Sequence, residues 1–292
     1  MPKKKERKKM ATLLFDATYI CYRAYYSTGS LSNGKTVTGI PYGFFWTILQ
    51  MSERFRTNKI ILCWDSKHSR RRELFNDYKA SRRQNKTEEE RAERSEIHAQ
   101  INALHNEILP RTGFQNNLFQ EGLEADDLIA RAVIDNPTIT FIGVSGDNDL
   151  FQLLRFKNFT MFSPTANKLW TASSFAMEYG VPAREWVTVK SIAGCPGDGV
   201  PGVPGVAVKT AVQYINENLN VEKKYESIIA NHALIKRNYR LVALPFAGTE
   251  SVKLVEDKLD GVNFGMLFGD LGFRSFQTDE MLQRWEKFVE GY

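Results

Sequence analysis

The sequence predicts an α/β protein with a mostly parallel central sheet and helices on both faces. Short apolar runs rich in β-favouring residues occur at 11–15, 60–64 and 139–145. Helical patterns separate these runs, notably around 41–56 and 92–109. Strands that alternate with helices are typical of parallel sheets, because a parallel crossover needs a long connection and a helix supplies it.

Strand signals fade after about residue 164, and helical patterns follow. They lie at 172–179, 183–193, 206–219 and 222–239. A chain of 292 residues can form one or two domains. We therefore expect three regions, namely a disordered basic tail over 1–10, an α/β domain over 11–166 and a helical region over 167–292.

The composition, 42% hydrophobic and 25% charged, is that of an ordinary globular protein. No apolar run approaches the roughly 20 residues that span a bilayer. The Lys-rich N-terminus is not followed by the apolar stretch of a signal peptide, because Asp16 interrupts it. We expect no membrane association and a cytoplasmic location. Cys21, Cys63 and Cys195 are far apart, so neither a disulfide framework nor a zinc site is indicated.

The net charge of +5 is unevenly distributed. Residues 1–10 carry +5 and residues 66–86 carry +6, which leaves −6 for the rest of the chain. A basic segment attached to an acidic body suits a protein that binds a polyanion with one part and cations with another. A solvated tail and an ordinary charged helix would produce the same numbers.

Three predicted strands end at an aspartate. The strands run into Asp16, Asp65 and Asp147, and Asp149 follows two residues later. Because ligands bind in the crevice beyond the carboxyl ends of parallel strands, these side chains should converge. A single aspartate after a strand is usually a turn or cap residue. Three in the same position indicate a shared site.

A fourth acidic group opens the predicted helix that contains LIARAVI. Its members are Glu124, Asp126 and Asp127. Acidic residues in the first turn of a helix also complement its dipole, so this group alone is ambiguous. Crowded carboxylates repel one another unless a cation neutralises them, and oxygen ligands select Mg²⁺ or Mn²⁺. A pair of such ions commonly serves hydrolysis of a phosphodiester.

Residues 194–211 form a Gly/Pro-rich segment that forbids regular structure until Val206. A helix can follow, with Lys209 in its first turn. Glycines allow close backbone approach, and amides at a helix N-terminus attract anions. The loop could therefore seat a DNA phosphate, with contacts from Gly202, Val203, Gly205 and Lys209. It lacks the G-x-x-x-x-G-K-[ST] spacing of a nucleotide-binding loop.

These segments together resemble the 5′-nuclease, or flap endonuclease, family of phage and bacterial 5′–3′ exonucleases and the 5′-nuclease domain of DNA polymerase I. The matching stretches occur in family order over about residues 11–277. They are LLFDATYICYRAYY, CWDSKHSRRRELFNDYKASR, EGLEADDLIA, VSGDNDLFQLL, PGDGVPGVPGVAVKTA and FGDLGFRSF.

The resemblance implies a divalent-metal-dependent 5′-nuclease that cuts branched, flapped or 5′-ended DNA as a monomer in a bacterial or phage-infected cell. It implies a first metal ion, Mg²⁺ or Mn²⁺, and a second one nearby. The first would be held by Asp16, Asp65, Glu124, Asp126 and Asp147. The second would lie near Asp149 and Asp198, with Asp127 alongside.

The resemblance also implies that the long charged segment 66–90 forms a helical arch over a 5′ single strand. Lys79 and Arg82 would contact the scissile phosphate, and Arg23 would lie beside the active site. Other arch residues available to DNA are Tyr78, which could stack on a base, and the basic run Arg70, Arg71 and Arg72. The Gly/Pro loop would belong to a helix–three-turn–helix element that binds duplex, with K⁺ at 199–206.

The chain departs from the family pattern at Cys195, where a second aspartate is expected beside Asp198. A thiol is a poor ligand for Mg²⁺, so the second site should be weakened. Two alternatives follow. One is a catalytically weak DNA-binding protein on the same scaffold. The other is a small-molecule phosphatase, but the second aspartate that it would need two residues after Asp16 is absent, since Thr18 stands there.

Overall fold

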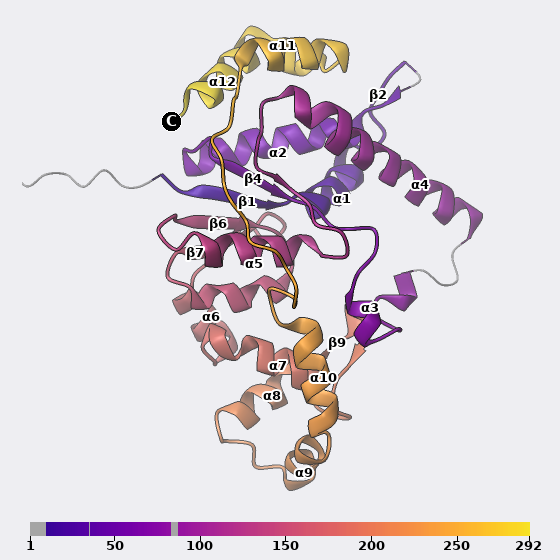
Figure 1. The fold of residues 1–292 in the computed structure, drawn as a ribbon, viewed down its shortest axis with the longest axis vertical. Helices are drawn as coiled ribbons and strands as arrows, with labels where there is room; N and C mark the ends of the chain where they lie inside the picture. The colour runs from indigo at the N-terminus through magenta and orange to yellow at the C-terminus, as the bar shows by residue number, and fades with distance from the viewer. Residues whose placement is uncertain (1–9, 35, 83–86) are drawn as a thin grey trace, which may run out of the picture.

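The computed structural model describes residues 10–34, 36–82 and 87–292, and a six-stranded sheet lies at its centre (Figure 1). The strand order is β5-β4-β1-β6-β7-β8. The first five strands in that order are parallel, and β8 is antiparallel to β7. Their bounds are β1 Thr12–Asp16, β4 Ile60–Cys63, β5 Asn117–Leu118, β6 Phe141–Val144, β7 Phe159–Ser163 and β8 Lys168–Trp170. The predicted fold class is confirmed.

Side chains of β1 alternate between two cores, because successive residues of a strand point to opposite faces. Leu13 and Phe15 pack into the core beneath one set of helices. This set comprises α1 Ala17–Thr28, α2 Gly39–Phe55, α4 Glu88–Ala103, α11 Gly261–Asp270 and α12 Asp279–Glu290. Leu14 packs into the other core, with α5 Ala125–Asp135, α6 Ala172–Tyr179 and α7 Trp186–Ala193.

The helical region below the sheet differs from the predicted pattern in two places. The stretch 222–239, predicted as one helix, is two helices, α9 Glu222–Ala230 and α10 His232–Val242. Asn231 separates them, and its side-chain amide donates to the Ser227 carbonyl at 2.8 Å. This local bond competes with the helix, which periodicity alone does not reveal.

The Gly/Pro segment contains a short hairpin before α8 Val208–Ile215, although no regular structure was expected there. Its strands are β9 Gly194–Cys195 and β10 Val200–Pro201. Gly194 has φ +79°, and a Cβ on it would lie 2.3 Å from the Gly202 nitrogen. Glycine at both positions therefore lets the two strands approach.

A long strap, residues 243–260, carries the chain from α10 back along the sheet to α11 (Figure 1). The Asn116 side chain bonds both the amide and the carbonyl of Val255. The boundary expected between 166 and 167 falls in the turn between the paired strands β7 and β8. Beyond it, α11 and α12 pack into the same core as α2, which precedes it. The boundary therefore does not separate two cores.

Candidate active site

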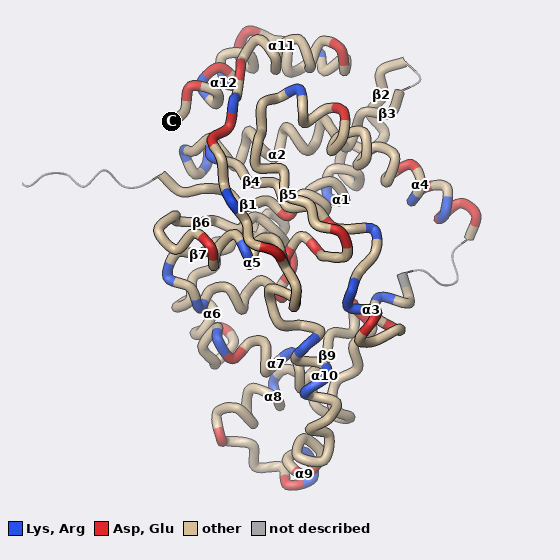
Figure 2. Tube along the Cα trace, in the orientation of Figure 1, with Lys and Arg blue, Asp and Glu red and all other residues tan. Residues whose placement is uncertain are grey.

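The three strand-end aspartates lie at one edge of the sheet, because their strands are adjacent and parallel. Asp16 is the last residue of β1 and pairs in register with Cys63 of β4. Asp65 and Asp147 follow the neighbouring strands β4 and β6 within three residues. Figure 2 shows acidic residues gathered in this central part of the molecule, close to the start of α5.

Each of these aspartates is oriented by a local backbone amide. Asp16 caps α1 and accepts from the Tyr19 amide at 3.0 Å. Asp147 caps η4 Asn148–Arg155 and accepts from the Asp149 amide at 2.8 Å. Asp65 accepts from the Ala125 amide at the start of α5, at 2.7 Å. The turn and cap functions that such residues usually have are thus present, and the same bonds hold the carboxylates together beyond the strand ends, a group termed here the acidic crevice after that position.

Ser145 links two of the strand ends, and the sequence analysis missed it. Its hydroxyl donates to Asp16 Oδ2 at 2.9 Å and accepts from the Asp147 amide at 3.1 Å. Ser145 is fully buried. A serine just after an apolar strand is too common to be distinctive, although its place two residues before Asp147 was a signal.

Several carboxyl groups of the acidic crevice lie close enough to repel one another. Burial, together with the nearby Asp65 and Asp147, raises the pKa of Asp16 to about 7. Burial and the adjacent Asp127 also raise the pKa of Asp126 well above its usual value. Asp126 Oδ1 is buried and has no hydrogen-bond partner among the described residues. A carboxylate oxygen in this state fits a site for a hard cation, since the nearby charge of Arg71 offsets only part of the cost of its burial.

No three acidic, cysteine or histidine side chains among the described residues lie close enough together to enclose a metal ion. The ammonium of Lys79 lies between two of the acidic side chains. Lys79 Nζ lies 2.9 Å from Glu124 Oε2 and 3.8 Å from Asp198 Oδ1. Burial alone would raise the pKa of Glu124, but Lys79 and Arg71 outweigh it and lower the pKa to about 2. The all-oxygen donor set still fits Mg²⁺ or Mn²⁺.

The arch segment is less helical in its described part than expected. It contains the four-residue helix α3 Arg71–Leu74 and the turn η1 Ala80–Arg82. Lys79 has φ +53° and donates its amide to the Asp198 carbonyl at 2.7 Å, so it is held at the crevice. Residues 83–86 and the side chain of Arg82 lie outside the described residues.

Tyr78 is not available to stack on a base, contrary to expectation. Its ring is 3% exposed, and its hydroxyl donates to Glu124 Oε2 at 2.9 Å. Burial, together with the charge of Glu124, raises the pKa of this hydroxyl. Its contacts instead fix Glu124, and stacking on DNA would first require removing Tyr78 from the core around Leu241.

Arg71 and Asp127 form a buried pair, so neither has the role expected for it. The guanidinium of Arg71 donates to both Asp127 oxygens, at 2.7 and 2.8 Å. Asp127 also accepts from the amides of Glu124 and Phe246, so each of its two oxygens already accepts two hydrogen bonds. Arg71 is 2% exposed and cannot reach DNA. Arg70 is exposed and Arg72 half-buried, so these two remain available.

A second group of polar side chains lies beside the first and contains a lysine that the sequence analysis missed. Lys190 Nζ of α7 lies 2.9 Å from Asp149 Oδ1, and Cys195 Sγ is 3.9 Å from Asp149 Oδ2. Burial and the carboxylate of Asp149 raise the pKa of the Cys195 thiol to about 12, so it is neutral. A lysine inside the apolar helix WVTVKSIA was the available signal.

The Gly/Pro loop presents only part of the predicted phosphate contacts. Lys209 is exposed in the first turn of α8, and Gly205 is open, with no atom near a Cβ placed on it. Val203 is 2% exposed, and its amide donates to the Ile192 carbonyl at 2.8 Å. Val203 therefore has no free donor for a phosphate. Gly202 approaches the Ala193 carbonyl too closely for a side chain.

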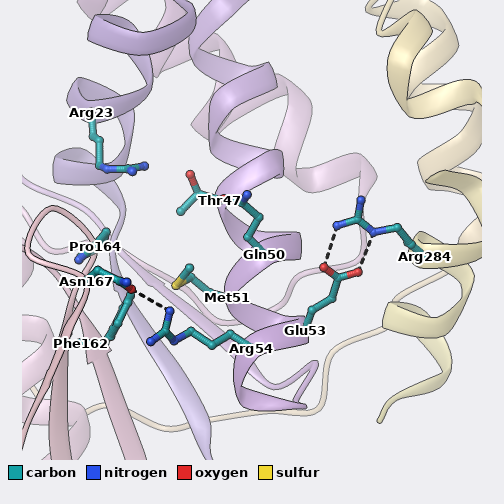
Figure 3. A pocket seen from close by; sticks show the side chains of 10 residues that line it. All are labelled: Arg23, Thr47, Gln50, Met51, Glu53, Arg54, Phe162, Pro164, Asn167 and Arg284. Carbon is teal, nitrogen blue, oxygen red and sulfur yellow. Dashed lines mark hydrogen bonds and ion pairs between the residues drawn. The ribbon is translucent and has the colours of Figure 1, made fainter. Parts of the chain in front are cut away.

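Arg23 lines a separate pocket of about 600 Å³ beside α1 and α2. Figure 3 shows its side chain directed into the pocket, opposite Thr47 and Gln50 of α2. No hydrogen bond or ion pair among the described residues joins Arg23 to the acidic crevice. Its predicted place beside the active site therefore rests on the resemblance alone.

Comparison with known proteins agrees with this geometry. A 5′–3′ exonuclease of Buchnera aphidicola (Schizaphis graminum) is 27% identical over 97% of this chain and 99% of its own length. A 5′–3′ exonuclease of Bacillus subtilis is 30% identical over 74% of this chain and 73% of its own length. In fold, the chain resembles the 5′-exonuclease of phage T5 with bound zinc ions, at a TM-score of 0.70, 20% identity and coverage of 96% and 98%.

The fold and the acidic crevice define a resolvase-like α/β domain. The model of the N-terminal resolvase-like domain of 5′–3′ exonucleases matches residues 11–180, more than half of the chain. The chain belongs to the 5′–3′ exonuclease family. Among the described residues no helix is long and apolar enough to cross a membrane.

Proposed function

We propose that this protein is a divalent-metal-dependent 5′-nuclease that hydrolyses phosphodiester bonds of DNA at a 5′ end, flap or branch. The observation that supports the proposal is the position of Asp16, Asp65 and Asp147 at the ends of adjacent parallel strands, where the charges of Asp65 and Asp147 raise the pKa of Asp16. The family supports the activity. The phage T5 flap endonuclease, a structural neighbour at a TM-score of 0.69, was crystallised with DNA and metal ions.

Asp16, Asp65, Asp126 and Asp147 would hold the cation, with Glu124 at its border. When bound, the ion supplies a more acidic water and stabilises charge on the leaving oxygen. Ser145 and the helix-start amides keep the carboxylates aimed, which avoids reorganisation as charge develops. Lys79 is an ammonium already held at the mouth of the crevice, and it would pair with the scissile phosphate. Arg82 and Arg23 are proposed to assist it.

Duplex DNA would bind along the Gly/Pro loop and α8, independently of its sequence. Lys209 and Gly205 are exposed there, and no side chain caps the start of α8, a helix end that attracts anions. K⁺ could bridge the loop to a phosphate, as the family resemblance implies. Arg70 and Arg72 would contact the single strand. We expect the protein to act as a monomer.

A second candidate function, a catalytically weak DNA-binding protein, is favoured by two features of the site. Both Lys79 and Lys190 place ammonium groups among the carboxylates, and Cys195 replaces a hard ligand. If these ammonium groups outcompete metal ions, the scaffold would bind flap DNA without cutting it.

Cleavage of a 5′-flap DNA in Mg²⁺ or Mn²⁺, with a chelator as control, separates the two functions. We expect metal-dependent release of a 5′ fragment. Asp147→Asn should reduce the cleavage rate by at least about a hundredfold, because it removes a first-ion ligand, and should leave flap affinity nearly unchanged. The exposed Asp270→Asn, at the end of α11, is the matched control. Tight binding without cleavage under any divalent ion would establish the second function instead.

A further inference from the structure

Lys190 holds a positive charge inside the crevice. Its Nζ lies 2.9 Å from Asp149 Oδ1, and the two side chains are only 18% and 14% exposed. The charge of Lys190 also acts on the Cys195 thiol, whose pKa it lowers against the larger effect of burial. Its helix, α7, is anchored by buried neighbours on both sides of Lys190 in the sequence, Val189 and Ser191. The charge is therefore part of the folded framework.

The ammonium of Lys190 lies beside the side chains that would have to bind a second metal ion. Asp149 lies two residues from Asp147 and is already paired with Lys190. Cys195 presents a neutral sulfur 3.9 Å from Asp149. A thiol is a poor ligand for Mg²⁺ or Mn²⁺, and a divalent ion here would be in direct repulsion with the ammonium. Asp198 alone is too small a donor set, so these residues do not fit a second ion.

We propose that Lys190 takes the place of the second metal ion, so that the centre works with one divalent cation and one built-in ammonium. This inference rests on the proposed function, which places the first cation at Asp16, Asp65, Asp126 and Asp147. The ammonium neutralises Asp149 and offers donors to a phosphate oxygen, but it cannot activate a water as a Lewis acid. The rate should therefore depend on metal concentration as for a single ion, without sigmoidal onset.

Lys79 and Lys190 belong to different elements and pair with different carboxylates. Lys79 belongs to the arch segment and sits between Glu124 and Asp198, next to residues that the first ion needs. Lys190 is carried by the regular helix α7, and its ion pair is with Asp149 of the second group. Removing Lys190 should therefore change how many ions bind, whereas the first site should keep its ion.

Counting Mn²⁺ ions on the purified full-length chain tests the inference without measuring cleavage. Equilibrium dialysis, with electron paramagnetic resonance of the bound ions, should find one Mn²⁺ per wild-type chain with the spectrum of an isolated ion. Lys190→Met should bind one more, and the two nearby ions should broaden each other's signal. Cys195→Asp combined with Lys190→Met should bind the additional ion at least tenfold more tightly, because a hard ligand is restored.

The matched control is Lys157→Met, which removes an exposed lysine just before β7, at the opposite edge of the sheet. It should bind as many ions as the wild type, as should Lys190→Arg, which keeps the charge. If Lys190→Met does not fold by circular dichroism, Lys190→Gln replaces it. The inference is overturned if the wild type already binds a coupled ion pair, or if removing the charge adds no ion. A separate result would show that the proposed first site is wrong: Asp126→Asn would bind as many ions as the wild type. The two failures can therefore be told apart.

Discussion

Asp16 is the residue at which charge, burial and hydrogen bonding are most tightly combined. It is 9% exposed, accepts from Ser145 and from the Tyr19 amide, and faces Asp65 and Asp147. These two hydrogen bonds favour the ionised carboxylate, but burial and the neighbouring charges outweigh them. Its proton is therefore retained up to about pH 7 when no cation is present.

This shift predicts how stability depends on pH in the presence of a chelator. A carboxyl with a raised folded-state pKa stabilises the fold below its unfolded pKa of 3.8, and this contribution is lost as pH rises through the folded pKa of about 7. We expect the free energy of unfolding in urea to fall by roughly 2–4 kcal/mol between pH 4 and 7.5. Saturating Mg²⁺ should offset the loss near neutral pH.

The control for this prediction is Asp16→Asn, which should make the profile between about pH 4 and 7 less steep. The slopes contributed by Asp65, Asp126 and Asp149 should persist, because burial raises the pKa of each of these carboxyls as well. Equal slopes in the wild type and Asp16→Asn would show that Asp16 ionises normally in the fold.

For single residues, the sequence predicted the position of the aspartates well, but it did not predict which basic side chains pair with them. Asp16, Asp65 and Asp147 follow apolar runs, so their edge of the sheet is predictable from periodicity alone. Whether a carboxylate is free depends on distant residues. Asp127 is neutralised by Arg71, which is 56 positions away, and no local pattern encodes that pairing. The same holds for Lys190 and Asp149.

Among the elements, the short helix α3 is joined to α5 and α10 by the polar contacts of one side chain, Arg71, while its Leu74 packs on the apolar core. Arg71 pairs with Asp127 of α5, donates to the Leu241 carbonyl of α10 at 2.8 Å and lies over the Phe246 ring at 4.9 Å. A single guanidinium thus joins the arch segment, α5 and the end of α10. The position of Lys79, eight residues later, depends on this anchor.

Arg71→Met should destabilise the protein by about 3–5 kcal/mol, because it leaves the Asp127 carboxylate buried without its counter-charge. Urea unfolding measures the loss. The exposed neighbour Arg70 is the control, and Arg70→Met should change stability by less than about 0.5 kcal/mol. A double variant, Arg71→Met with Asp127→Leu, should recover part of the loss. Similar small effects for both single variants would contradict the anchoring role.

Element prediction succeeded where one periodicity ran without interruption, as in α6, whose bounds match the predicted 172–179. It failed where local hydrogen bonds or glycines decided the outcome. Asn231 splits the expected helix 222–239, and Gly194 and Gly202 allow a hairpin in a segment that looked irregular. Each of these outcomes depends on a single residue, so a prediction that averages propensity over a stretch of sequence misses it.

In the whole molecule, the last thirty residues complete the core beneath α2. Trp285 is 2% exposed, and its ring centre lies 5.0 Å from those of Phe264 and Phe268 and 6.1 Å from that of Phe45. Phe45 belongs to α2, so the C-terminal helices and the N-terminal half share one aromatic cluster. The helices predicted from the sequence ended at 239, so α11 and α12 were not predicted. The irregular strap over 243–260 gives no sign that the chain returns to the sheet and forms further helices.

Trp285→Ala should therefore lower the free energy of unfolding by about 3–5 kcal/mol, although Trp285 belongs to a different end of the chain from the acidic crevice. Thermal and urea unfolding measure the effect. Glu286→Ala, at the exposed neighbouring position in α12, should be nearly neutral. A neutral Trp285→Ala would mean that the C-terminal helices are accessory to the fold.

The strap over 243–260 also sets an order for synthesis. A nascent chain that has delivered every crevice residue through Asp198 still lacks Phe264, Phe268 and Trp285, and these reach the core only after the strap has left the ribosome. Until then the apolar face of α2 is uncovered and available to chaperones. The residues beyond the strap must be made before α2 is covered, so a chain that stops within the strap should form an insoluble fragment rather than a smaller nuclease.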